Sequence, residues 1–147
     1  MKIAIASDHG GFVLKQEILT LLTELGYEFT DFGPATADSV DYPDYAFLVS
    51  DAVVAGEYER GILICGTGIG ISIAANKVKG VRCALVHDVF SARATREHND
   101  SNILAMGGRV IGVELAKEIV RTWLSTDFIG SHHLARIEKI ANYEQGS

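Results

Sequence analysis

Cysteine, positive charge and long apolar runs are all scarce in this 147-residue sequence. The two cysteines, Cys65 and Cys83, stand inside apolar stretches typical of buried strands, which argues against a disulfide framework and favours reduced thiols in the cytoplasm. No apolar run approaches the ~20 residues of a membrane span, so we expect no membrane partner. The first residues turn polar at Ser7-Asp8, too early for an export signal, which also favours a cytoplasmic protein.

The shortage of positive charge limits the possible partners. Lys and Arg total 13 against 19 Asp and Glu, which gives a formal net charge of −6. Nucleic acid is therefore an unfavourable partner, because phosphate backbones attract clustered Lys and Arg. A small anionic substrate remains compatible, since it needs only a few cations focused in one cleft. The hydrophobic content of 48% is enough for one core, and we expect a single domain over residues 1–147.

Short branched apolar runs alternate with longer segments of helical periodicity. Strands are predicted at residues 2–7, 27–32, 61–65, 82–87 and 102–106. Helices are predicted at about residues 14–25, 45–53, 69–77, 89–97, 112–124 and 131–143. This alternation predicts a three-layer α/β/α fold with a five-stranded, parallel, Rossmann-like sheet. The last helix, 131–143, falls outside the alternation, which leaves it available to pack on a partner subunit.

Ligands of such sheets bind beyond the carboxyl ends of the strands. The five segments at these positions are Asp8-His9, Asp41-Tyr42-Pro43-Asp44, Cys65–Gly70, His87-Asp88 and Gly107-Gly108-Arg109. The first of them precedes two further glycines but is weak on its own, because Asp and Gly are ordinary turn residues. We expect it to face the Cys65–Gly70 segment across neighbouring strands.

The segment Cys65-Gly66-Thr67-Gly68-Ile69-Gly70 is the most informative of the five. Alternating glycines between a strand and a helix let the main chain turn tightly and aim its N–H groups at an anion. A dinucleotide fingerprint would need a glycine where Ile71 stands, and the Gly-Lys-Ser/Thr of a P-loop is missing. The segment therefore predicts a nest of amides for a small anion or a developing oxyanion.

Cys65 opens this glycine loop and has two interpretations. The N-terminus of a helix favours the thiolate, which would make Cys65 a general base or a nucleophile. Alternatively, a buried cysteine is simply a small hydrophobic residue, which is our interpretation of Cys83. The loop that follows leads us to favour a functional role for Cys65. Thr67 could donate a hydrogen bond to a substrate oxygen or cap the helix.

Four residues further along the chain are candidates with structural alternatives. Arg109 could reach a phosphate or form a surface ion pair. His98 ends a helix of roughly eleven residues, which would carry it ~16 Å away from Cys65 of its own chain. A catalytic His98 would therefore serve the site of a neighbouring subunit, and otherwise it is a polar helix end. His132 and Arg136 lie one turn apart on one helix face, where they could bind phosphate or remain solvated. The histidines and carboxylates lack metal-ligand spacing, so we expect no metal.

The chain resembles the type B family of ribose-5-phosphate isomerases, which also includes galactose-6-phosphate isomerase subunits, over essentially its whole length. The resemblance rests on Asp8-His9-Gly10-Gly11, Asp41-Tyr42-Pro43, Gly61–Ser72, Arg96-Glu97-His98-Asn99-Asp100 and Gly107-Gly108-Arg109-Val110. It implies an aldose–ketose isomerase that interconverts ribose 5-phosphate and ribulose 5-phosphate through an enediolate, without a cofactor. It also implies homodimers with shared active sites, which could associate further into tetramers.

The resemblance implies roles for individual residues as well. The catalytic positions are Cys65 as the base between C1 and C2, Thr67 beside it, and His98, which helps to open the furanose ring. The positions implied to bind substrate are Asp8, His9, Tyr42, Gly66, Thr67, Gly68, Ile69, Gly70, Asn99, Arg109, His132 and Arg136.

His132 departs from the family pattern, which has an arginine there. A neutral imidazole is a weaker phosphate ligand than a guanidinium. Phosphate affinity could therefore be lower or pH-dependent, or the preferred substrate could be a tetrose or hexose phosphate. Two other classes of function stay open: a non-catalytic phosphate- or nucleotide-binding module, and an enzyme that uses Cys65 as a covalent nucleophile.

Overall fold

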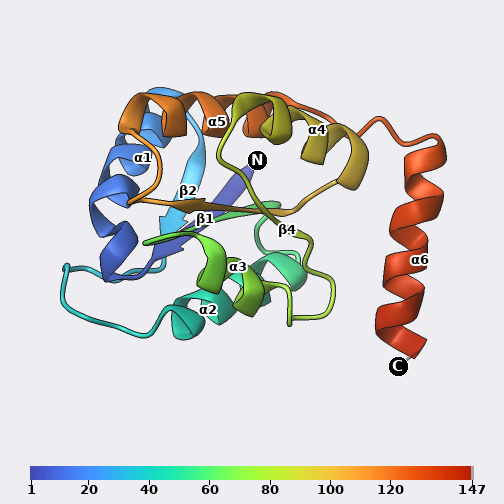
Figure 1. Ribbon diagram of the computed structural model, residues 1–147, viewed down its shortest axis with the longest axis horizontal. Coiled ribbons are helices and arrows are strands. Elements are labelled where there is room, and N and C mark those ends of the chain that lie inside the picture. Colours follow the sequence, from blue (N-terminus) through green and yellow to red (C-terminus); the bar gives the residue numbers. More distant parts are fainter. Residues whose placement is uncertain (147) are drawn as a thin grey trace.

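A computed structural model describes residues 1–146 and contains a five-stranded parallel sheet covered by helices on both faces (Figure 1). The strands are β1 (Lys2–Ser7), β2 (Glu28–Asp31), β3 (Arg60–Cys65), β4 (Cys83–Leu85) and β5 (Ile103–Gly107). They lie in the order β2-β1-β3-β5-β4, and every neighbouring pair is parallel. The predicted three-layer fold is confirmed.

The helices divide between the two faces of the sheet. One face carries α1 (Phe12–Glu24), α4 (Val89–Asn99) and α5 (Val113–Ser125), and the other carries α2 (Tyr42–Val54) and α3 (Ile69–Ala75) (Figure 1). A short 3-10 turn, η1 (His9–Gly11), leads from β1 into α1. The last helix, α6 (His132–Gly146), stands beside this three-layer body (Figure 1).

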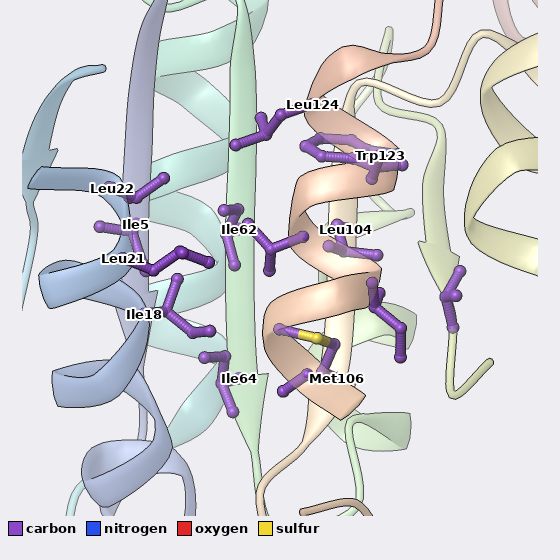
Figure 2. Close-up of a cluster of buried hydrophobic side chains, with 14 of the residues drawn as sticks. Ile5, Ile18, Leu21, Leu22, Ile62, Ile64, Leu104, Met106, Trp123 and Leu124 are labelled. Atoms are coloured by element: carbon purple, nitrogen blue, oxygen red, sulfur yellow. The ribbon is translucent and has the colours of Figure 1, made fainter. Parts of the chain in front are cut away.

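A hydrophobic core fills each side of the sheet, because alternate residues of a strand point to opposite faces. Along β1, Ile3 and Ile5 join the core under α1 and α5, while Ala4 and Ala6 join the core under α2 and α3. Figure 2 shows the first core, in which side chains of α1 and α5 meet those of the central strands. Strands buried on both faces read as continuous apolar runs, which is why the sequence indicates them clearly.

The connections place a crevice at the carboxyl ends of the central strands. The chain passes from β1 to β2 in one direction and from β3 to β5 and β4 in the other, so the order reverses between β1 and β3. The register aligns Ser7 with Ile64, and Cys65 with Gly107. The segments that follow β1, β3 and β5 therefore leave the sheet at one level, where open α/β sheets bind their ligands.

The structure differs from the predicted boundaries mainly at the edges of the sheet. The predicted strand 82–87 shrinks to Cys83–Leu85, and 27–32 shrinks to Glu28–Asp31, because each of these edge strands has a neighbour on one side only. Tyr42 and Pro43, predicted in a loop, form the first turn of α2, where proline fits because its missing N–H would have no partner.

Helix α6 has little contact with the rest of its own chain. None of its described residues is buried, and its exposed apolar side chains include Leu134, Ile140 and Tyr143. Glu144 ties it to the body by accepting a hydrogen bond from the Gly80 amide at 2.8 Å. Within residues 1–146, none of the helices combines the length and apolar character needed to cross a bilayer.

Candidate active site

Cys65 is the last residue of β3, and its sulfur accepts a hydrogen bond from the glycine loop. The amide nitrogen of Gly68 lies 3.1 Å from Cys65 Sγ. Gly68 reaches this position in the left-handed conformation, with φ of 78°, immediately before α3 begins. A main-chain donor at this distance stabilises negative charge on sulfur. Cys65 is 5% exposed, so the thiol is largely shielded from solvent.

The loop after β1 packs directly against the loop after β3. The amide of Asp8 donates to the carbonyl of Ile64 at 3.1 Å, and a Cβ on Gly10 would lie only 3.0 Å from the amide nitrogen of Gly66. The Asp8 carboxylate accepts a hydrogen bond from the Gly11 amide at 3.1 Å, which fixes its orientation at the start of η1. The structure therefore brings Asp8 to the Cys65 loop.

His9 reaches this region from the turn after β1, and Tyr42 reaches it from the first turn of α2. His9 Nδ1 accepts a hydrogen bond from the Val40 amide at 3.3 Å, which ties the β1 loop to that segment. The Tyr42 ring lies against Gly70, where a Cβ would come within 2.7 Å of the ring. The Tyr42 side chain therefore borders the glycine loop, while the His9 ring is held against the segment before α2.

Arg109 covers the glycine loop from the segment after β5. Its amide donates to the carbonyl of Gly66 at 2.9 Å, and the Gly108 amide donates to the carbonyl of Cys65 at 2.8 Å. Its guanidinium lies beside Gly66, with Nη1 3.2 Å from the position of a Cβ there. No ion pair found within residues 1–146 includes Arg109, so this exposed cation is available to an anion.

Thr67 precedes the N-cap residue of α3, Gly68, and its side chain contacts the first residue of the helix. Its Oγ1 accepts a hydrogen bond from the Ile69 amide at 3.2 Å. A hydroxyl that accepts one hydrogen bond can still donate its proton, so a substrate oxygen could also be bound. We call the whole group the carboxyl-end cluster, and it consists of Asp8, His9, Tyr42, Cys65–Gly70 and Arg109.

A second group of predicted residues lies where α4 ends and α6 begins. The rings of His98 and His133 stack with centroids 4.4 Å apart and an interplanar angle of 18°. The ring of His132 lies 4.1 Å from that of His133. We call this group the α6 cluster, and it consists of His98, Asn99, His132, His133 and Arg136.

The α6 cluster disfavours additional positive charge. The pKa of His133 lies below its usual value, first because its surroundings reduce its hydration, and then because His132, His98 and Arg136 oppose a further positive charge. A neutral imidazole can stack and accept hydrogen bonds, and a protonated one adds a cation for a phosphate. The surroundings of His133 therefore favour its neutral form.

The two clusters lie at opposite ends of α4. The helix begins after Asp88, next to His87, whose ring contacts Gly107 at the level of Cys65. Its 11 residues then run away from that edge over ~16 Å to His98. Among the residues that the structure describes, no hydrogen bond, ion pair or ring contact joins the two clusters. One chain alone does not bring the predicted site residues together.

Three structural findings have no counterpart in the predicted site. Asn99 lines a groove of about 430 Å³ between α6 and the β4 edge, together with residues such as Arg82, Cys83 and Ile140. His133 joins the stack, although its only signal in the sequence is its place beside His132. His87 accepts a hydrogen bond from the Gly107 amide, although the sequence indicates only that His87 belongs to a segment beyond the end of a strand. Over residues 1–146, no group of three or more His, Cys, Asp and Glu residues could hold a metal ion.

The sequence matches a family model described as Ribose/Galactose Isomerase over residues 3–140. Ribose-5-phosphate isomerase B of Escherichia coli (strain K12) is 51% identical over 144 residues, which are 98% of this chain and 97% of that protein. D-erythrulose-4-phosphate isomerase of Pectobacterium atrosepticum is 43% identical over 145 residues, which are 98% of this chain and 95% of that protein.

Solved structures with the same fold are similar over nearly their full length. Ribose-5-phosphate isomerase B of Clostridium thermocellum superposes with a TM-score of 0.98 at 55% identity and covers 99% of each chain. Ribose-5-phosphate isomerase B from Mycoplasma genitalium, solved with bound ribulose 5-phosphate, superposes with a TM-score of 0.95 at 42% identity, covering 99% of this chain and 97% of that one.

Replacing Gly68 by alanine should both destabilise the protein and disturb Cys65. The left-handed conformation costs an alanine about 1–2 kcal/mol. The added Cβ would also lie 2.6 Å from Leu85 Cδ1 and 2.7 Å from the carbonyl carbon of Met106, which adds about 1–3 kcal/mol of overpacking. We expect a lower free energy of unfolding in urea and slower alkylation of Cys65 near neutral pH.

Gly56→Ala is the matched control for this prediction. Gly56 has a similar φ of 83° but open space where a Cβ would be, so its replacement adds backbone strain alone. Equal losses of stability in the two variants, with unchanged alkylation of Cys65, would contradict the packing described for Gly68.

Proposed function

This chain belongs to the ribose/galactose isomerase family and is a sugar-phosphate isomerase, and we propose that it interconverts ribose 5-phosphate and ribulose 5-phosphate with Cys65 as the base. The observation that carries the proposal is the 3.1 Å hydrogen bond from the Gly68 amide to Cys65 Sγ, at the mouth of the glycine loop. Support also comes from the ribose-5-phosphate isomerase B relative solved with bound ribulose 5-phosphate.

The carboxyl-end cluster has the groups that this isomerisation needs. The Cys65 thiolate removes the proton from C2 of the open-chain aldose, and the electrons of that C–H bond form the enediolate. The Gly68 and Ile69 amides donate to Cys65 Sγ and Thr67 Oγ1, respectively. We expect the other amides of residues 66–70 and the Thr67 hydroxyl to donate to the developing negative charge, because preorganised donors lower the energy of such an intermediate. The thiol then returns the proton to C1, while the proton of the O2 hydroxyl passes to O1 and O2 becomes the ketose carbonyl oxygen. The net reaction moves two hydrogens and leaves the cysteine unchanged.

We further propose that the site is completed across a homodimer. The α6 cluster of a second copy would supply His98 to open the furanose ring and Asn99 to bind the sugar. His132 and Arg136 of that copy would then bind the phosphate together with Arg109. The support is the ~16 Å length of α4 between the clusters and the absence of buried residues from the described part of α6. Association of such dimers into tetramers is compatible with this arrangement.

A tetrose phosphate is the second candidate substrate. The observation in its favour is His132 at a position where the family resemblance implies arginine, together with 43% identity to D-erythrulose-4-phosphate isomerase of Pectobacterium atrosepticum. Ratios of kcat/KM for ribose 5-phosphate and erythrulose 4-phosphate, measured with a chelator present, distinguish the two candidates.

The proposed chemistry requires Cys65 to remain a free thiol. Both cysteines are unpaired in the structure. Reducing conditions preserve free thiols, so we propose that the protein works in the cytoplasm. Membership of an isomerase family leaves no support for a non-catalytic phosphate-binding module.

Cys65→Ser should lower kcat by about 10²–10⁴-fold, the contribution typical of a positioned general base, because a serine hydroxyl is far less acidic than a thiol. The measurement is conversion of ribose 5-phosphate to ribulose 5-phosphate by the purified protein in deuterated water. We expect the unsubstituted enzyme to incorporate solvent deuterium at the carbon that receives the proton.

Cys83→Ser is the control for the cysteine substitution. Cys83 lies on β4, away from the carboxyl-end cluster, where burial raises the pKa of its thiol to about 12. The control should retain activity. Full turnover by Cys65→Ser would assign the base to another group, and a covalent adduct trapped between substrate and Cys65 would assign it a nucleophilic role instead.

Mixing Cys65→Ala with His98→Ala protein should restore activity if the dimer shares its sites. Each mixed dimer has one site with both residues intact and one with both replaced. Random exchange in a twofold dimer should therefore restore roughly one quarter of the wild-type activity. Mass spectrometry of the intact dimers checks that exchange occurred. No recovery after complete exchange would place the whole site within one chain.

His132→Arg should lower KM for ribose 5-phosphate by about tenfold, because a guanidinium forms stronger charge-assisted hydrogen bonds with phosphate than an imidazole does. Steady-state kinetics at constant ionic strength measure this change. Gln145→Arg adds the same charge at the far, exposed end of α6 and should leave KM unchanged. An unchanged or higher KM in His132→Arg would remove residue 132 from the phosphate site.

A further inference from the structure

The imidazole of His87 accepts a hydrogen bond that a main-chain carbonyl would accept in a regular parallel sheet. Strand β4 ends at Leu85, and the Val86 amide still donates to the Ala105 carbonyl at 3.0 Å. In a parallel ladder the next hydrogen bond would run from the Gly107 amide to a carbonyl of the neighbouring strand. Instead, the Gly107 amide donates to His87 Nε2 at 2.9 Å. A titratable side chain therefore holds the last residue of β5.

Gly107 lies next to two parts of the carboxyl-end cluster, the glycine loop and Arg109. A Cβ on Gly107 would lie 2.6 Å from the carbonyl carbon and oxygen of Thr67, so its main chain lies directly against the glycine loop. Two residues further on, the Arg109 amide donates to the Gly66 carbonyl at 2.9 Å. The orientation of the Gly107 peptide therefore influences where both the loop and the Arg109 guanidinium lie.

We propose that His87 is a positioning residue for this isomerase: neutral His87 holds the Gly107 peptide, and protonation of His87 releases it and weakens binding of the substrate phosphate through Arg109. The role for Arg109 in this inference rests on the proposed function. The hydrogen bond itself does not, because it is a contact within the chain.

The chemistry of the imidazole gives the direction of the pH effect. Nε2 accepts a hydrogen bond only while it carries no proton, so the neutral ring has its proton on Nδ1. Burial lowers the pKa of His87 below 6.5, and the Asp88 carboxylate partly opposes that shift. The contact is therefore complete at neutral pH, and it is lost as the pH falls through the lowered pKa of His87.

The carboxylate next to His87 is stabilised in its charged form. Asp88 accepts hydrogen bonds from the amide and hydroxyl of Ser91, at 2.6 and 2.8 Å, which lower the pKa of its carboxyl further below neutrality. The end of β5 presents a main-chain amide to the ring, and the charged residue of the segment that follows is Arg109. The proposed pH effect therefore belongs to His87.

Two substitutions distinguish the effect of losing the hydrogen bond from the effect of protonating residue 87. His87→Gln keeps an acceptor of similar reach that cannot be protonated near neutral pH, and His87→Leu removes the acceptor. We expect His87→Leu to raise KM for ribose 5-phosphate by between about twofold and about tenfold at every pH, with kcat largely retained. We expect His87→Gln to match the wild type at neutral pH.

The pH profile is the decisive kinetic measurement. Between about pH 8 and about pH 5, the wild-type KM should rise more steeply than that of His87→Gln, because only the wild type has an imidazole that becomes protonated at this position. The ionisation of the substrate phosphate affects both proteins equally, so it cancels in the comparison. A purely structural role would instead reduce the active fraction, which lowers kcat and leaves KM unchanged. Identical KM profiles for the wild type and His87→Gln would overturn the proposal.

Nuclear magnetic resonance tests the contact without any turnover. Nitrogen-15 shifts of the wild-type His87 ring should show the proton on Nδ1 at neutral pH, and the Gly107 amide should lose its protection from exchange as His87 becomes protonated. A proton on Nε2, or protection independent of His87 ionisation, would overturn the inference whatever the enzyme acts on. If ribose 5-phosphate is not converted, the proposed function fails, and titration with inorganic phosphate replaces KM in the same comparison of variants.

Discussion

The hydrogen bond from the Gly68 amide to the Cys65 sulfur is the contact on which the carboxyl-end cluster depends. It requires Gly68 in a left-handed conformation, packed so closely on the Met106–Gly107 peptide that a Cβ has no room. Gly107 is constrained in turn, because Thr67 occupies the place of its Cβ. The sulfur is therefore positioned by main-chain packing between the ends of β3 and β5. Such packing is rigid, and rigid donors stabilise a developing charge with little reorganisation.

The central strands could be predicted from the sequence because both of their faces are buried, but the edges could not. On the outer side of β4, the Asn76 side chain donates to the Cys83 carbonyl and accepts from the Cys83 amide, at 2.9 and 2.8 Å. On its inner side, His87 takes over the hydrogen bond to Gly107. Two side chains thus replace main-chain partners where the apolar pattern predicts a longer strand. A pattern of apolar residues contains no information about such replacements.

The same distinction applies to the candidate site. The meeting of Asp8, the Cys65 loop and Arg109 could be predicted, because parallel strands bring their carboxyl ends to one edge of the sheet. The separation of His98 from Cys65 could be predicted as well, from the length of the helix that leads to His98. The stack of His98 on His133 could not be predicted, because it depends on how α6 turns back toward α4 after a connecting segment without regular structure. Local periodicity specifies helices, and it does not specify how two of them meet.

The proposed dimer gives the exposed position of α6 a physical explanation. Within one chain, α6 is held by contacts such as the stack on His98 and the hydrogen bond between Glu144 and Gly80, and none of its described residues is buried. Helices in water derive most of their stability from packing of an apolar face, so this helix needs a partner surface. If a second copy supplies that surface, docking of α6 and completion of the active site are one event. A ligand that bridges the two clusters would then stabilise the dimer, because it binds the assembled state and not the separated chains.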